Sequence, residues 1–529
     1  MARTAPPPAA DGGPRRLWLA AVIVAATVLA AAWALLVPIF EAPDEPQHFD
    51  YALSIASAGH LLNARDRPTV RSHWTVVVHP ETRYLMEATD WERVYLDRTQ
   101  RMPAAYGTVA YFQQLDRGAP PGTLAGQPAQ NPGLLALYPF GYYAVLAAWL
   151  WLVAHLTSSL TVLFFAARLL SVLLLPVSLA FSYGISRELG ASPRLSILLT
   201  ALLGLFPLTG FVASAIQPDN LALALVSSGA YLGLRARRQG QPAVMLGGLG
   251  LILGALLVTK FQFYACLAVP LLAALLVERH FRGARTPLSM SVPLLVVPSV
   301  ALLAVHFWVV WGTTTPVYTT WPGVPNTAGL HTALAGGPVS LARYVATALV
   351  AAAQTYYFGG QSFRTFWGTV GWLENPVQFG VPVLAPLSRA IEATWTVLIV
   401  GLAIVRLSQV GGRLLQAAGR GRRLLALRLA LGDPLLIGYL LFTGFMFAAF
   451  VVTDGTFFPQ GRNWFPFLLP TWMLALRYAP RALPRRSRFG KDFPGLTAGA
   501  LLVFCVAGSG LALATVAHRF YGLLPFFSG

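Results

Sequence analysis

Ten consecutive residues near the N-terminus hold a dense set of groups that can do chemistry. The run Glu41-Ala42-Pro43-Asp44-Glu45-Pro46-Gln47-His48-Phe49-Asp50 contains four carboxylates and one histidine in a mostly apolar chain. A carboxylate beside a hydroxyl group can take its proton as that oxygen attacks an electrophile. It can also hold a divalent cation against a phosphate leaving group. Asp44 and Glu45 are adjacent and flanked by prolines, and either role suits them.

The same residues also fit a structural role. Asp44-x-x-Gln47, with Pro46 in the first turn, is the pattern of a capping box for a helix from Pro46 to Ala58 that stops at Gly59. The two roles can coexist, because one carboxylate can cap while the other acts. The helix pattern by itself favours Glu45 as the acting group.

Two further residues are candidates for the same chemistry. His48 follows Asp44 by four residues, which places both near one helix face. It is either a second proton carrier or metal ligand, or a histidine hydrogen-bonded at the membrane interface. Asp219 follows Pro218, and it is either a second carboxylate of the site or the cap of the next helix. These residues allow a divalent cation, Mg²⁺ or Mn²⁺, as a cofactor without requiring one.

Three cations are candidates for binding a lipid-linked phosphate. Lys260 and Arg462 each stand at the end of an apolar run, and a charge at membrane depth is a functional hypothesis by default. A lipid phosphate lies at that depth and needs cations. Arg364 is a third candidate. The alternative is snorkelling to the interface. Arg168 lies inside an apolar run and is expected to form a structural ion pair.

Aromatic residues form two groups that can line a substrate groove. One is the run 362–372, which includes Phe366, Trp367 and Trp372, and the other is Tyr142 with Tyr143. Aromatic faces stack on sugar rings and line grooves for acyl chains. The alternative is an aromatic belt at the membrane interface, although belts are usually scattered over many helices.

The composition identifies the class of protein. Of the 529 residues, 56% are hydrophobic and 11% are charged, whereas soluble domains are about 25% charged. Many apolar runs reach about 20 residues, the length that spans a bilayer. The net charge of +18 comes from arginines in short loops between these runs, so it indicates membrane topology and not nucleic-acid binding. Two cysteines cannot build a disulfide framework or a metal cluster.

These features predict an all-α polytopic membrane protein with about eleven transmembrane helices. Residues 1–16 are expected to be a disordered cytoplasmic tail, and 17–529 a single membrane domain. Arg15 and Arg16 keep the start of the first span inside, so residue 41 emerges outside and regular alternation leaves the C-terminus outside as well. The expected spans are 17–40, 160–186, 195–215, 221–234, 243–258, 263–276, 292–311, 390–405, 435–452, 463–476 and 496–516.

Two large extracytoplasmic segments are expected to carry the function. Residues 41–133 form a catalytic loop, and 312–386 form a substrate groove. Residues 134–156 are read as a juxtamembrane or re-entrant helix, because a full crossing there would place the following arginines outside. The sequence has no Walker A loop, GxGxxG fingerprint or HExxH motif. A sugar donor used outside is therefore expected to be lipid-linked.

With these features the chain resembles the GT-C superfamily of multi-spanning glycosyltransferases. More closely, it is similar to a bacterial family of predicted multi-pass membrane proteins of unknown function. The matching signatures are Pro43-Asp44-Glu45-Pro46-Gln47-His48-Phe49, Phe366-Trp367-Gly368-Thr369-Val370-Gly371-Trp372, Lys260 after an apolar run, and Gln460-Gly461-Arg462. Two positions depart from that family: Asn463 stands where Tyr is more usual, and Phe140-Gly141 stands where a Pro-Pro often precedes the two tyrosines.

The resemblance implies an enzyme of the bacterial cytoplasmic membrane. It would transfer a sugar with inversion from a polyprenyl-phosphate donor to a cell-envelope glycan, lipid or protein, with an acidic residue of the first loop, Asp44, as the base. One alternative is a transporter or flippase of lipid-linked sugars, whose carboxylates should lie mid-membrane on broken helices. Another is an envelope glycan polymerase or ligase, whose outer arginines and histidine are partly matched by Arg364, Arg462 and His48.

Overall fold

The structure is a computed structural model. It describes residues 13–61, 79–96, 100–120, 139–310, 328–357, 434–452 and 489–523, with short pieces between 369 and 473. The candidate residues that lie outside the described part are Arg364, Phe366, Trp367, Trp372 and Arg462. The expected span at 390–405 and most of that at 463–476 also lie outside it.

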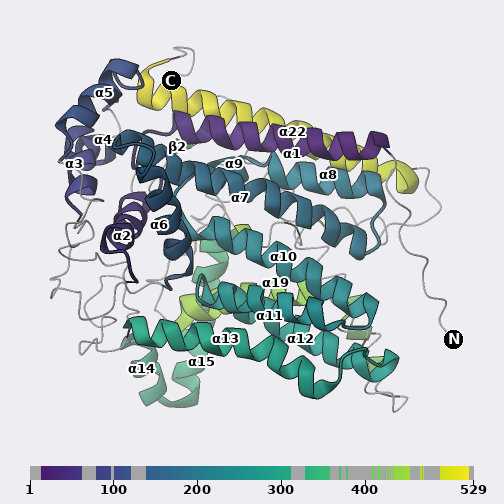
Figure 1. The fold of residues 1–529 in the computed structure, drawn as a ribbon. Helices are drawn as coiled ribbons and strands as arrows, with labels where there is room; N and C mark the ends of the chain where they lie inside the picture. Colours follow the sequence, from purple (N-terminus) through teal and green to yellow (C-terminus); the bar gives the residue numbers. More distant parts are fainter. Residues whose placement is uncertain are drawn as a thin grey trace.

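Long apolar helices running along one common direction build the body of the molecule (Figure 1). They form because a chain in hydrocarbon must satisfy its backbone polar groups within the segment. The longest are α1 (Gly13–Leu36), α7 (Leu160–Glu188), α10 (Pro218–Gln239), α12 (Phe261–Arg282), α13 (Leu288–Val310) and α22 (Phe489–Tyr521). Helix α7 packs on α1 and α10, and α10 packs on α12, so the main buried core lies between them.

The described helices confirm a helical membrane protein. Four of them, α1, α7, α12 and α13, are long and apolar enough to cross a membrane. Helix α10, expected to contain a span at 221–234, is not among these. Shorter apolar helices are α6 (Gly141–Ala154), α11 (Ala243–Leu257) and the apolar part of α19 (Pro434–Val452). The number of eleven spans stays a prediction.

The expected span at 195–215 is broken in the structure, and whether it crosses the membrane stays a prediction. Helices α8 (Pro193–Gly204) and α9 (Pro207–Ser214) replace it and are bent by 59° relative to each other. Pro207 has no amide hydrogen and crowds the preceding turn, so the helix breaks there. Nδ2 of Asn220 donates to the carbonyls of Val212 and Ala215, at 2.9 Å each, and satisfies the end of α9.

Shorter helices cover one end of the bundle (Figure 1). They are α2 (Glu45–Ala58), α3 (Pro80–Ala88), α4 (Trp91–Leu96), α5 (Val109–Gly118) and α6. Helix α2 ends at Gly59 as predicted, with the positive φ of 69° that glycine adopts readily. Within the helix expected at 134–156, the described helix starts only at Gly141.

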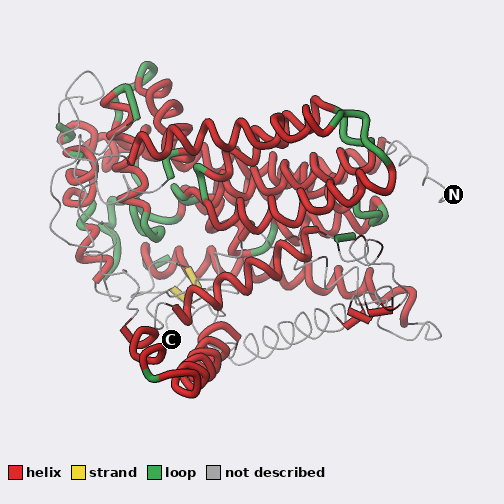
Figure 2. The backbone as a smooth tube through the Cα atoms, turned by 90° about the horizontal axis from the view of Figure 1, so that it is seen from below, coloured by secondary structure: helices red, strands yellow, loops and turns green. Residues whose placement is uncertain are grey.

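The remaining described elements lie in two places, a group of helices joined to α12 and a pair of short strands beside α22. Helices α14 (Ala328–Ala335) and α15 (Gly337–Tyr357) pack together, α15 packs on α19, and α19 packs on α12. Strands β1 (Thr369–Val370) and β2 (Val377–Gln378) pair antiparallel, with Thr369 opposite Gln378 (Figure 2). Helices α14 and α15 and the two strands are the described elements of the predicted groove segment 312–386.

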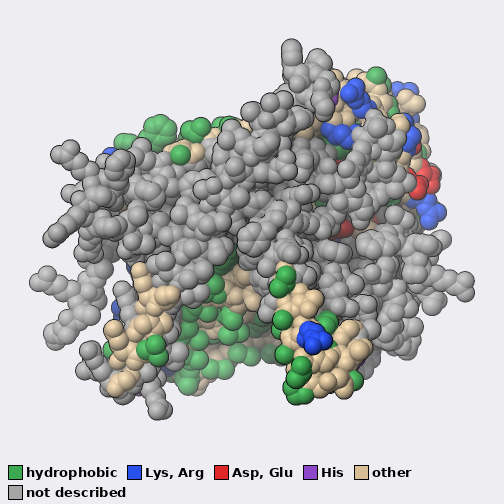
Figure 3. Space-filling view, turned by 180° about the vertical axis from the view of Figure 1, so that it is seen from behind, with side chains coloured by type: hydrophobic (Ala, Val, Ile, Leu, Met, Phe, Trp, Pro, Cys, Tyr) green, Lys and Arg blue, Asp and Glu red, His purple; other side chains and the backbone are tan. Residues whose placement is uncertain are grey.

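The C-terminal ends of α1 and α22 lie at the same end of the bundle. Oη of Tyr521 donates to the carbonyl of Leu36 (2.8 Å), and the amide of Met102 donates to the carbonyl of Phe520 (2.9 Å). The face in Figure 3 shows described acidic side chains only toward this same end. Residues after α1 and after α22 therefore share a side, and the assignment of that side to the cell exterior stays a prediction.

Candidate functional site

Asp44 occupies the N-terminus of α2 in a left-handed backbone conformation. Its φ is 62° and its ψ is 6°, a region that Asp tolerates better than most residues. Its side chain makes no capping hydrogen bond to α2, so the capping-box alternative is wrong. Asp44 is half-buried, whereas Glu41, Glu45 and Asp50 are buried. Among the four carboxylates of this run, it keeps partial access to its surroundings.

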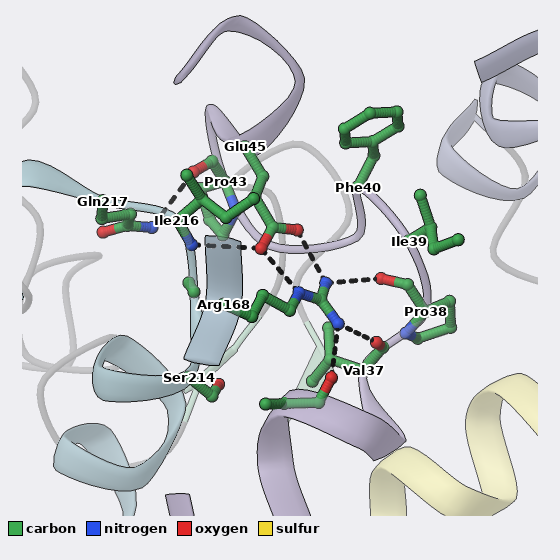
Figure 4. A network of polar contacts seen from close by, with 12 residues as sticks. Val37, Pro38, Ile39, Phe40, Pro43, Glu45, Arg168, Ser214, Ile216 and Gln217 are labelled. Atoms are coloured by element: carbon green, nitrogen blue, oxygen red, sulfur yellow. Dashed lines mark hydrogen bonds and ion pairs between the residues drawn. The ribbon is translucent and has the colours of Figure 1, made fainter. Parts of the chain in front are cut away.

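Glu45 forms a buried ion pair with Arg168 (Figure 4). Nε of Arg168 donates to Oε1 (2.8 Å) and Nη2 to Oε2 (2.7 Å), and neither side chain is more than 1% exposed. The amide of Ile216 donates to Oε1 at 3.1 Å. The prediction that Glu45 acts as a catalytic carboxylate does not fit this burial, because its oxygens already have partners that are costly to remove.

Arg168 also completes the hydrogen bonds at the end of α1 (Figure 4). Nη1 donates to the carbonyls of Ala34 (2.7 Å) and Val37 (2.5 Å), and Nη2 donates to that of Pro38 (2.8 Å). Pro38 has no N–H for the Ala34 carbonyl, which is the usual partner in a helix. With the two bonds to Glu45, all five donors of the guanidinium are used. Arg168 thus ties α7 to both ends of the α1–α2 connection.

Aromatic side chains hold the middle of the same connection. Oη of Tyr106 accepts from the amide of Ile39 (2.8 Å), and Nε1 of Trp91 donates to the carbonyl of Phe40 (2.9 Å). Trp91 is the first residue of α4 and Tyr106 lies between α4 and α5, so both come from the segment 41–133 that the sequence predicts as the catalytic loop. The connection that leads to Asp44 is therefore fixed from several elements at once.

Glu41, within this connection, is buried as a neutral group. Burial raises the pKa of its carboxyl to about 8, although the charges of Arg519 and Arg168 oppose the rise and that of Glu45 adds to it. Its Oε1 has no hydrogen-bond partner among the described residues. At pH 7 the folded chain therefore keeps a proton on Glu41.

We expect the stability of the protein to fall as the pH rises from 4.5 to about 8. In this window the unfolded chain loses the Glu41 proton while the folded chain keeps it, so the unfolded state binds fewer protons and stability decreases with pH. Glu41→Gln is expected to remove this fall. Tryptophan fluorescence, recorded during heating in detergent at a series of pH values, measures the unfolding temperature and hence this pH dependence. Glu92→Gln, at an exposed position of α4, should keep the wild-type fall; equal pH dependence of both variants contradicts the assignment.

Lys260 and Asp219 form an ion pair close to the Asp44 segment. Nζ of Lys260 is 2.6 Å from Oδ1 of Asp219, and the side chains are 17% and 4% exposed. Gln217, not Asp219, is the N-cap residue of α10, and its Nε2 donates to the carbonyl of Pro43 (3.1 Å). A phosphate at Lys260 would therefore share the ammonium group with Asp219.

The two tyrosines predicted for the groove lie at the same end of the bundle but are buried. Nδ1 of His48 is 2.9 Å from Oη of Tyr143, a contact that the structural alternative expects, and the role of His48 as a proton carrier stays a prediction. The hydroxyl of Tyr142 is close enough to Glu45 and Asp219 for their charges to act on it. Tyr142 and Tyr143 are 0% and 1% exposed, which does not fit direct stacking on a sugar ring.

A glycine brings α6 against the turn that carries Lys260. The amide of Gly141 donates to the carbonyl of Val258 at 2.7 Å. A Cβ at Gly141 would lie 2.7 Å from Oγ1 of Thr259 and 2.8 Å from the Val258 carbonyl, so a larger residue cannot fit without movement. The segments of Asp44, Tyr142, Asp219 and Lys260 thus meet at one end of the helices.

The described residues do not form a metal centre. No group of three or more His, Cys, Asp or Glu side chains among them is arranged to hold an ion. Asp219 already pairs with Lys260, and Glu45 with Arg168. This set of described donors does not fit Mg²⁺ or Mn²⁺.

The contacts that hold the connection before Asp44 in place were not predicted from the sequence. Gln217, Trp91 and Tyr106 contact the connection before Asp44, but nothing in their local sequence indicates those contacts. Arg168 did give a signal, because an arginine inside an apolar run needs a partner. Its partner could not be named, since Glu45 is 123 residues away in the chain.

Comparisons with known proteins relate the chain to one family. A family model described as "Predicted membrane protein (DUF2142)" matches residues 27–469. Among curated proteins, no sequence matches the chain.

Solved structures of an oligosaccharyltransferase from Archaeoglobus fulgidus resemble the chain distantly. They are a form tethered to an acceptor peptide (11% identity, TM-score 0.39), AglB with an inhibitory peptide and a dolichol-phosphate (12%, 0.40), and an apo form (13%, 0.39). Each alignment covers 96% of this chain, which spans only 56–57% of the archaeal one. At these TM-scores the likeness does not establish a shared fold or activity.

Proposed function

The chain belongs to the family of predicted membrane proteins described as DUF2142, and from this premise we propose that it is a GT-C-like membrane glycosyltransferase. It moves a sugar from a polyprenyl-phosphate donor to a cell-envelope glycan, lipid or protein on the extracytoplasmic face. The position of Asp44 is the observation that carries this proposal. It is a half-buried carboxylate at the end of a bundle of apolar helices, next to a connection fixed by Arg168.

The reaction needs one group to accept a proton, and Asp44 suits that role. Its carboxylate takes the proton of the acceptor hydroxyl as that oxygen bonds to the anomeric carbon of the sugar. The bond from that carbon to the phosphate oxygen breaks, and polyprenyl phosphate leaves with the electron pair. Attack opposite the leaving group inverts the anomeric centre. The Glu45–Arg168 pair contributes by holding the adjacent backbone in one geometry.

Lys260 is the described cation best placed for the donor phosphate. It stands at the start of α12, and Asp219 orients its ammonium group at the same end of the bundle as Asp44. An ammonium group that donates to one carboxylate can still donate to a phosphate oxygen, because it has three N–H donors. Arg364 and Arg462 stay predicted as further cations for this phosphate.

One observation favours a second candidate, a flippase of lipid-linked sugars. The broken pair α8–α9 ends at Ser214, two residues before Ile216, whose amide donates to buried Glu45. Broken helices beside buried charges are typical of transporters. Asp44 argues for the transferase, since a carboxylate with partial access at the bundle end suits an acceptor better than a transport path through the bundle.

Deleting the gene tests the proposal directly. We expect one polyprenyl-phosphate sugar to accumulate in the deletion strain and to return to its normal level when the wild-type chain is re-expressed. Mass spectrometry of lipid extracts measures this. An unchanged set of polyprenyl-phosphate sugars contradicts the proposal. Translocation of that lipid in proteoliposomes without transfer to any acceptor would favour the flippase.

A further inference from the structure

A second charged cluster lies at the far end of the bundle from Asp44. Glu278, near the end of α12, is surrounded by Arg237, Arg282 and Arg428. Helix α10 has Asp219 in its first turn and Arg237 in its last, and its 22 residues span about 33 Å at about 1.5 Å per residue. The cluster is therefore separate from the candidate site by roughly the thickness of a bilayer core.

The cluster holds two guanidinium groups side by side. Nε of Arg282 (2.6 Å) and Nη2 of Arg428 (2.7 Å) both contact the same oxygen, Oε1 of Glu278. Arg237 contacts the other oxygen at 3.2 Å. Three positive charges face one negative charge, so a net charge of about +2 remains, which a single carboxylate cannot neutralise.

Donors of this pair remain available for a ligand. The two Nη atoms of Arg282 and the Nη1 atom of Arg428 make no hydrogen bond with any described residue. The side chains of Arg282 and Arg428 are 53% and 28% exposed. By contrast, Nη1 of Arg237 is used by the carbonyls of Leu431 and Gly432. Two adjacent guanidinium groups with outward donors match the oxygens of a phosphate.

An exposed apolar side chain of α12 lies against the pair. Arg428 lies over the ring of Phe281, 4.7 Å from its centroid, and Phe281 is partly exposed. An anionic headgroup with acyl chains fits this combination of charge and apolar surface, whereas a soluble phosphate would use only the charge.

We propose that Arg282 and Arg428 bind the phosphate of an anionic phospholipid at the end of the bundle opposite Asp44. Glu278 positions both guanidinium groups, and the exposed ring of Phe281 contacts an acyl chain. This site does not depend on the proposed transfer reaction, because no residue is shared between the two.

Lipid retention by the purified protein tests the site. Native mass spectrometry counts phosphatidylglycerol and phosphatidylcholine retained from mixed micelles. We expect the wild type to prefer phosphatidylglycerol, Arg282→Gln to weaken its retention about fivefold, and the double variant Arg282→Gln/Arg428→Gln about 30-fold. Arg194→Gln, an exposed arginine at the start of α8 on the same end of the bundle, is the control and should retain the wild-type preference.

Three results would overturn the proposal. They are equal retention of both lipids, an equal loss in the Arg194→Gln control, and displacement of phosphatidylglycerol by inorganic phosphate at matched concentration. Arg282→Gln keeps the test decisive if the double variant fails to fold, because Arg282 is half-exposed and Glu278 still pairs with Arg237 and Arg428.

Discussion

Asp44→Asn is expected to leave the protein folded and inserted, and to slow sugar transfer about 10²–10⁴-fold, the usual contribution of a general base. Asn has the shape of Asp and also tolerates the left-handed backbone at this position, where φ is 62°. It cannot take the acceptor proton at neutral pH. The rate at which the accumulated polyprenyl-phosphate sugar disappears after re-expression in the deletion strain measures the effect.

Asp90→Asn is the matched control for this experiment. Asp90 lies in the same outer segment, also has a positive φ (54°), and its side chain is half-exposed in a surface pair with Arg93. We expect it to turn over the lipid at the wild-type rate. Wild-type turnover by Asp44→Asn, at equal amounts of folded protein, would remove Asp44 from the role of base.

Arg168→Met is expected to destabilise the folded protein by about 3–5 kcal/mol, the usual cost of breaking a buried ion pair from one side. The change leaves Glu45 charged and 0% exposed, and it removes the donors for three carbonyls at the end of α1. The two buried thiols, Cys266 and Cys505, provide the measurement, since a thiol-reactive dye labels them only as the protein unfolds on heating.

Arg93→Met is the control for this prediction. Its ion pair with Asp90 is about half exposed on both sides, so its loss should cost less than about 1 kcal/mol. The double variant Arg168→Met/Glu45→Met should recover part of the loss, because it no longer buries an unpaired charge. The carbonyls of Ala34, Val37 and Pro38 still lack donors in the double variant, so recovery is incomplete. An unfolding temperature of Arg168→Met equal to that of the wild type contradicts the structural role.

These two predictions assign different roles to the adjacent carboxylates of Asp44 and Glu45. Asp44→Asn should change the rate and not the stability, whereas Glu45→Gln should lower the unfolding temperature, because it removes a charge that Arg168 needs. Comparing both variants in the same strain assigns one role to each residue.

The sequence by itself determined the class of the protein and the stretch that holds its candidate site. Apolar runs of membrane length are visible in composition alone, because a bilayer imposes the same demand on every spanning segment. The end of α2 at Gly59 was predictable for a similar reason, since it depends on local backbone chemistry. The break at Pro207 within the expected span at 195–215 could not be predicted in the same way. It depends on Asn220, a residue beyond that span, whose side chain donates to the last turn of α9.

Only the tertiary structure decided which carboxylate of the pair is engaged. Local pattern favoured Asp44 as the cap and Glu45 as the acting group, and the packed chain shows no capping bond from Asp44 and a buried Glu45. The reason is that Glu45 is neutralised by Arg168, which comes from a helix more than a hundred residues away. A pairing across that separation depends on how α1, α2 and α7 pack, and no local sequence pattern contains that information.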